Sequence, residues 1–163
     1  MTLPEINTTY LLDFLVRLLN TPSPTGLAEP AIALIEKELS VFPDLKLART
    51  RKGGLVARWQ GQHDDAPRAL TAHADTLGAM VKEIKSSGRL QLTKIGGFAW
   101  NTVEGEGCWV FTSDGRKVRG SLLLDKASSH VHGGAVNETK RDDDNMEVRL
   151  DARTTSAAET EGL

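Results

Sequence analysis

The stretch that decides the fold is Ala69-Leu70-Thr71-Ala72-His73-Ala74-Asp75-Thr76-Leu77-Gly78. Its first four residues form a short apolar run between loop residues, which predicts a buried strand of an α/β sheet. Because side chains alternate along a strand, His73 and Asp75 are expected on one side, at the sheet edge where α/β proteins bind ligands. A neutral imidazole can bind zinc through one nitrogen while a carboxylate accepts the proton of the other. On spacing alone, a structural histidine held by a hydrogen bond is an open alternative.

The sequence before this stretch predicts two helices and then two strands. Apolar residues at spacings of three and four indicate the helices, the first of them capped by Asn7 or Thr8, and alternating residues indicate the strands. The predicted helices cover residues 11–19 and 27–39, and the predicted strands cover residues 45–49 and 55–59. Pro22 and Pro24 end the first helix and suggest a stiff helix connection rather than a binding loop. Residues 1–74 are therefore expected to form an α/β region.

After Asp75 the pattern changes to short strands separated by glycine-rich turns. The predicted strands are residues 79–85, 90–95, 108–112, 117–124 and 146–150. No helix is expected before Thr155, where a short helix begins, and residues 141–145 are expected to be a solvated loop. Residues 75–163 are therefore predicted to form a second, mainly β region that resembles a barrel or a sandwich.

Composition excludes several classes of protein. Twenty Lys and Arg residues against 22 Asp and Glu residues give a net charge of −2, with both signs mixed along the chain, so a nucleic-acid partner is not expected. No apolar stretch approaches the roughly 18 residues of a membrane span, and no secretory signal is recognisable. The single cysteine, Cys108, allows no internal disulfide. These features predict a soluble protein of the reducing cytoplasm without a membrane partner.

Several of these motifs together resemble the M42 family of metallo-aminopeptidases. The resemblance rests on Thr21-Pro22-Ser23-Pro24-Thr25-Gly26, Lys52-Gly53-Gly54-Leu55-Val56-Ala57, residues 72–81 and Ile95-Gly96-Gly97. It implies a catalytic α/β domain interrupted after its His-x-Asp strand by an inserted β-rich domain used for oligomerisation. It also implies that His73 is a ligand of a centre of two divalent ions, zinc or cobalt, and that Asp75 is the active-site carboxylate that orients it. The implied substrate is a peptide or a small amide.

The sequence departs from the pattern of the family in two ways. Thr76-Leu77 stands where Glu-Ile is usual, and Gly54 where asparagine is common. The remaining metal ligands and the glutamate base of the family lie beyond the inserted domain, whereas this sequence ends at Leu163, inside it. A zinc site needs about three protein ligands, and a two-metal site needs more. We therefore expect the isolated chain to be an inactive fragment with no stoichiometric metal, whose incomplete β-rich domain supports a homo-oligomer.

Other residues with chemical potential have simpler interpretations. His63 lies in a polar loop, and His130 and His132, which could chelate a metal as alternate strand residues, are better explained by a loop or an oligomer contact. Cys108 has no neighbouring base, so a buried strand thiol is expected. The three tryptophans are expected to anchor cores or interfaces from strands. They are Trp59, Trp100 and Trp109.

The sequence is also compatible with two alternative functions. The chain could be a non-catalytic assembly module in which the β-rich half makes subunit contacts. It could also belong to related two-metal deacylases or carboxypeptidases, which use a His-x-Asp strand but insert a mixed α/β lid later in the chain. The immediate change to strands and glycines after Asp75 disfavours that second alternative.

Overall fold

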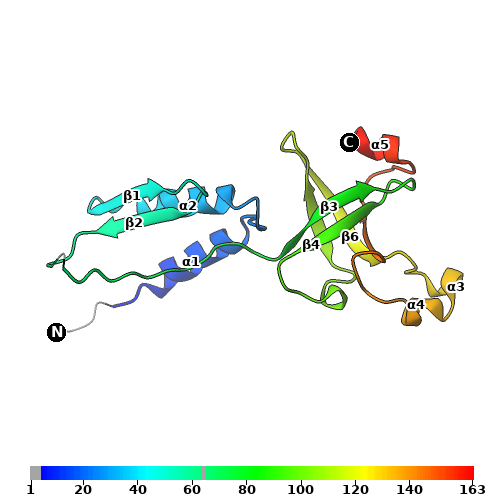
Figure 1. Ribbon diagram of the computed structural model, residues 1–163, viewed down its shortest axis with the longest axis horizontal. Coiled ribbons are helices and arrows are strands. Elements are labelled where there is room, and N and C mark those ends of the chain that lie inside the picture. Colours follow the sequence, from blue (N-terminus) through cyan, green and yellow to red (C-terminus); the bar gives the residue numbers. More distant parts are fainter. Residues whose placement is uncertain (1–4, 64) are drawn as a thin grey trace. The chain divides into compact units, whose positions relative to one another are not determined.

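The computed structural model describes residues 5–63 and 65–163 and divides into two compact units, Met1–Thr76 and Leu77–Leu163 (Figure 1). The first unit holds two helices and a hairpin, and the second holds a five-stranded sheet with short helices. Both together give the α/β class that the sequence predicts.

The two predicted helices of the first unit are confirmed. Helix α1 covers Thr8–Leu19, and the side chain of Asn7 caps it by accepting a hydrogen bond from the backbone N–H of Tyr10 at 3.0 Å. Helix α2 covers Glu29–Leu39 and carries proline in its first turn, where the missing N–H costs nothing. Large apolar side chains of α1 remain exposed, among them Leu11, Leu12, Leu15, Val16 and Leu19.

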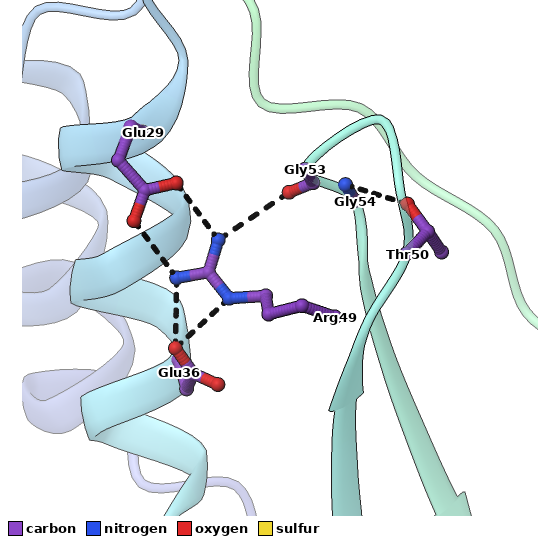
Figure 2. A network of polar contacts seen from close by, with 6 residues as sticks. All are labelled: Glu29, Glu36, Arg49, Thr50, Gly53 and Gly54. Atoms are coloured by element: carbon purple, nitrogen blue, oxygen red, sulfur yellow. Dashed lines mark hydrogen bonds and ion pairs between the residues drawn. The ribbon is translucent and has the colours of Figure 1, made fainter.

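The hairpin of the first unit consists of β1 (Leu45–Arg49) and β2 (Leu55–Trp59), paired antiparallel as predicted. Arg49 ties the hairpin to α2 (Figure 2). Its guanidinium donates to Glu36 at 2.7 and 2.9 Å and to Glu29 at 3.1 and 3.3 Å. The same group also donates to the carbonyl of Gly53 in the turn at 3.3 Å. One side chain therefore joins the strand, the turn and the helix.

The predicted buried strand over residues 69–72 is not formed. Residues 69–75 have no regular secondary structure, and the side chain of Leu70 is fully exposed. A strand needs a neighbour for its backbone hydrogen bonds. In the described part of the chain, the sheet of β1 and β2 contains no third strand, so this segment has no such neighbour. Its end makes only a single parallel bridge, between Pro24 and Thr76.

The second unit is an antiparallel sheet in the order β3-β4-β7-β6-β5. Its strands are β3 (Gly78–Ile84), β4 (Leu90–Ile95), β5 (Gly107–Phe111), β6 (Lys117–Leu124) and β7 (Met146–Leu150). All five agree with the prediction. The sheet is curled (Figure 1). Its buried side chains form one apolar core. The buried core residues are Leu90, Leu92, Trp100, Leu122, Leu124, Met146, Val148 and Leu150.

The second unit also contains a buried charge that is fully paired. Glu147 on β7 is 4% exposed and accepts hydrogen bonds from Lys85 Nζ, at 2.8 Å, and from Arg89. Lys85 and Arg89 lie on either side of the turn between β3 and β4. Because an unpaired buried carboxylate is costly, these two cations fix the hairpin beside β7 in the sheet.

Short helices correct three further expectations for the second unit. The 3-10 helix η1 covers Trp100–Thr102, α3 covers Ser129–His132 and α4 covers Ala135–Glu138, so helices do occur before Thr155. His130 and His132 therefore lie on one helical turn, not on a strand, and Trp100 reaches the core from η1. The expected short helix after Thr155 is confirmed as α5 (Ala157–Glu161).

The loop over residues 141–145 is not simply solvated. Arg141 forms an ion pair with Glu104 at 2.8 Å, and Asp143 accepts a hydrogen bond from the indole nitrogen of Trp100 at 2.6 Å. The charged residues of this loop thus satisfy polar groups at the margin of the core. Their polarity predicted exposure, but Arg141 and Asp143 are half-buried beside their partners.

Candidate functional site

The structure brings His73 and Asp75 together. The ring atom His73 Nδ1 lies 3.0 Å from Asp75 Oδ1. Since an ionised carboxylate only accepts hydrogen bonds, the proton of this contact belongs to Nδ1. The lone pair of the neutral ring then lies on Nε2, the nitrogen directed away from the carboxylate. This is the orientation in which a histidine is ready to bind a metal ion.

A third residue of the site was not recognised in the sequence. The hydroxyl of Thr25 donates to Asp75 Oδ2 at 3.0 Å, across 50 positions of the chain. Hydrogen bonds hold the pKa of Asp75 below its ordinary value. The larger effect comes from the Thr25 hydroxyl and the smaller one from the His73 ring. Thr25 lies in the proline-rich connection between α1 and α2, which the sequence indicated to be only a stiff linker. A contact between such distant residues leaves no local signal in the sequence.

The donor set fits one ligand of a metal centre. The side chain of His73 is 84% exposed, so its Nε2 can be reached by an ion. Within residues 5–63 and 65–163, no three His, Cys, Asp or Glu side chains gather closely enough to hold a metal ion. His73, oriented by its carboxylate partner, therefore has the donor chemistry of a single metal ligand.

The other histidines and the cysteine do not join this pair. His63 is an exposed loop residue of the first unit, and His130 and His132 belong to α3 of the second. Cys108 on β5 is half-buried, and desolvation and then the charge of Asp151 raise the pKa of its thiol. A raised pKa keeps the thiol protonated, which argues against a nucleophile.

Sequence comparisons point to one family. Residues 53–163 match the family model described as M42 glutamyl aminopeptidase. The chain is 41% identical over 152 residues to "Putative aminopeptidase YhfE" of Bacillus subtilis (strain 168), an alignment that covers 93% of this chain and 43% of that protein. The chain thus spans less than half the length of this curated relative.

Two archaeal peptidases of known structure have a similar fold. A TET aminopeptidase from the marine sediment archaeon Thaumarchaeota archaeon SCGC AB-539-E09 has a TM-score of 0.81 and 21% identity, covering 96% of this chain and 42% of its own. The TET1 peptidase of Pyrococcus horikoshii, which can assemble into a tetrahedron or a large octahedral shell, has a TM-score of 0.71 and 18% identity. That match covers 94% of this chain and 43% of the archaeal one. At these identities the likeness concerns the fold.

Proposed function

The chain belongs to the M42 glutamyl aminopeptidase family, and from that premise we propose that it supplies part of the active site of a metal-dependent aminopeptidase. The substrate would be a peptide or small amide with a free amino terminus. The observation that carries the proposal is the contact of His73 Nδ1 with Asp75 Oδ1 at 3.0 Å, which leaves the other ring nitrogen available.

In the proposed site, His73 would hold one of two divalent ions through Nε2, and Asp75 would keep the ring in the tautomer that makes this possible. Bound zinc or cobalt would supply Lewis acidity and an activated water. Asp75 is suited to orient the imidazole because Thr25 donates a hydrogen bond to its Oδ2, which leaves Oδ1 to accept the proton of His73.

The proposed site is completed by residues outside this chain. A co-catalytic centre needs more ligands than one histidine, and the chain covers 43% of its Bacillus relative. The exposed apolar side of α1, with Leu12, Leu15 and Leu19, supports a larger domain that covers it. We therefore infer that the isolated chain is inactive as a peptidase.

The second unit is proposed to serve assembly. Trp109 on the edge strand β5 is 58% exposed, and Met80 on the other edge strand, β3, is also 58% exposed. Exposed aromatic and methionine side chains are common at interfaces. A homo-oligomer built through this sheet agrees with the assembly of the Pyrococcus peptidase. An assembly module without catalysis is the second candidate, favoured by this surface alone.

The alternative of a deacylase or carboxypeptidase predicted that the catalytic domain continues past Asp75 before a mixed α/β lid is inserted. The unit Leu77–Leu163 instead has an entirely antiparallel sheet, and its described helices have three to five residues. This argues for the aminopeptidase. None of the helices in the described residues is long and apolar enough to cross a membrane. A cytoplasmic location stays a prediction.

A chimera tests the proposed activity. In it, this chain replaces the matching segment of the Bacillus subtilis relative, and the unaltered relative is the reference. We expect the chimera loaded with zinc or cobalt to cleave aminoacyl p-nitroanilides with a free amine and to lose this activity with a chelator. Substrates with an acetylated amine should stay uncleaved. Equal cleavage of acetylated substrates, or no cleavage by a folded and metal-loaded chimera, would contradict an aminopeptidase.

A further inference from the structure

The connection between α1 and α2 returns to the segment that carries the candidate site. The backbone N–H of Thr76 donates to the carbonyl of Ser23 at 2.7 Å, and Pro24 and Thr76 form a parallel bridge. Ser23 is 1% exposed, so this junction is well packed. Thr76 contributes through its backbone, and its difference from the glutamate usual in the family therefore does not prevent the bridge. The connection is thereby fixed beside Asp75.

Thr25 and His73 hold the two oxygens of one carboxylate. Thr25 donates to Asp75 Oδ2 and His73 to Asp75 Oδ1, each at 3.0 Å. A carboxylate with one partner can rotate and exchange its oxygens. With a different donor on each oxygen, rotation breaks both hydrogen bonds. Thr25 therefore restrains the oxygen that accepts the proton of His73.

The restraint is effective only if Thr25 itself stays in place. Pro22 and Pro24 limit the backbone of the connection because the ring of proline fixes φ. The bridge between Pro24 and Thr76 also restrains the residue directly before Thr25. The side chain of Thr25 is thus presented to Asp75 by backbone contacts that do not involve the site. The backbone conformation of the connection therefore does not depend on the hydroxyl of Thr25.

We propose that Thr25 is a positioning residue, which acts through Asp75 to keep His73 in the tautomer protonated on Nδ1. The metal-binding meaning of this tautomer rests on the proposed function, but the tautomer itself does not. The three side chains form a relay in which the hydroxyl orients the carboxylate and the carboxylate orients the imidazole. Loss of the hydroxyl should release the imidazole without altering the fold.

Ring nitrogen shifts of His73 in the ¹⁵N-labelled isolated chain test the relay. The measurement is made at about pH 8.5, where an ordinary histidine is neutral, and His73→Gln assigns the signal. Thr25→Val has the shape of threonine without its hydroxyl. We expect it to lower the ratio of rings protonated on Nδ1 to rings protonated on Nε2 by about fivefold, the effect of one typical hydrogen bond. Thr25→Ser should restore the original ratio.

Thr21→Val is the matched control, because Thr21 lies at the start of the same connection and its hydroxyl donates to the carbonyl of Arg17 at 2.9 Å. It should leave the tautomer of His73 unchanged. An unchanged ratio in Thr25→Val, or an equal change in Thr21→Val, would overturn the positioning role. If Thr25→Val disturbs the amide spectrum, Thr25→Ala replaces it, and the tautomer ratio of His73 in Thr25→Ala is compared with that in Thr25→Ser. A chimera that is inactive with Thr25 intact would count against the proposed function alone.

Discussion

Replacing His73 with alanine in the metal-loaded chimera is expected to lower kcat/KM for aminoacyl substrates by more than about 100-fold. Loss of an outer partner of a metal ligand typically costs about 10- to 100-fold in metal affinity or activity, so loss of the ligand itself should cost more. Asp75→Asn, which removes only the charged acceptor of the Nδ1 proton, should fall within that smaller range. Kinetics with zinc in excess and metal analysis of the dialysed protein measure both effects.

His63→Ala is the control for this comparison, since His63 is an exposed loop histidine of the same unit without a place in the proposed site. It should leave both kcat/KM and metal content unchanged. If His73→Ala kept the activity of the parent chimera, His73 would not be a ligand. A larger loss in Asp75→Asn than in His73→Ala would reverse the roles assigned to the two residues.

The largest effect on stability is expected for Trp100→Ala, which should lower the free energy of unfolding of the second unit by about 3–5 kcal/mol. Trp100 is 3% exposed, and its ring meets Phe98 edge to face, with 5.2 Å between the ring centroids. Alanine would leave a cavity in the core and would remove the partner of Asp143. Urea unfolding followed by circular dichroism of the isolated chain measures the difference.

Trp109→Ala is the matched control on the same unit. Its side chain is 58% exposed on β5, so truncation should change the free energy of unfolding by no more than about 0.5 kcal/mol. A comparable loss in both variants would show that the core is not centred on Trp100. A change in the oligomeric state of Trp109→Ala alone, by contrast, would support the proposed assembly surface.

Periodicity predicted the longer helices and the strands of both units. Strands β4 and β6 alternate more and less buried residues, which is the period that burial of one face imposes. Helix α1 has apolar residues at the helical spacing, although none of its residues is buried. The short helices α3 and α4, of four residues each, are too brief for a helical period, and they were missed. The strand prediction for the segment around Leu70 was wrong for a different reason. Its composition is that of a buried strand, but strand formation depends on a partner, which composition does not reveal.

In the candidate site, likewise, one contact could be predicted from the sequence and another could not. The pairing of His73 with Asp75 could be predicted, because two residues separated by one position depend only on local geometry. The contact of Thr25 with Asp75 could not, since it depends on how the connection after α1 folds back. The ion pairs of Arg49, which join the hairpin to α2, are further contacts between residues far apart in the sequence. Charge patterns alone do not select its acidic partners.

Metal content and peptidase activity of the isolated chain test most directly whether His73 is one ligand of a site completed elsewhere. The chain is dialysed against zinc or cobalt, freed of excess metal, and assayed with aminoacyl p-nitroanilides. We predict less than one bound ion per chain and no hydrolysis, because the described residues offer no cluster of three ligands. One or more tightly bound ions per chain together with hydrolysis that His73→Ala abolishes would contradict this prediction, because the chain would then hold a complete site.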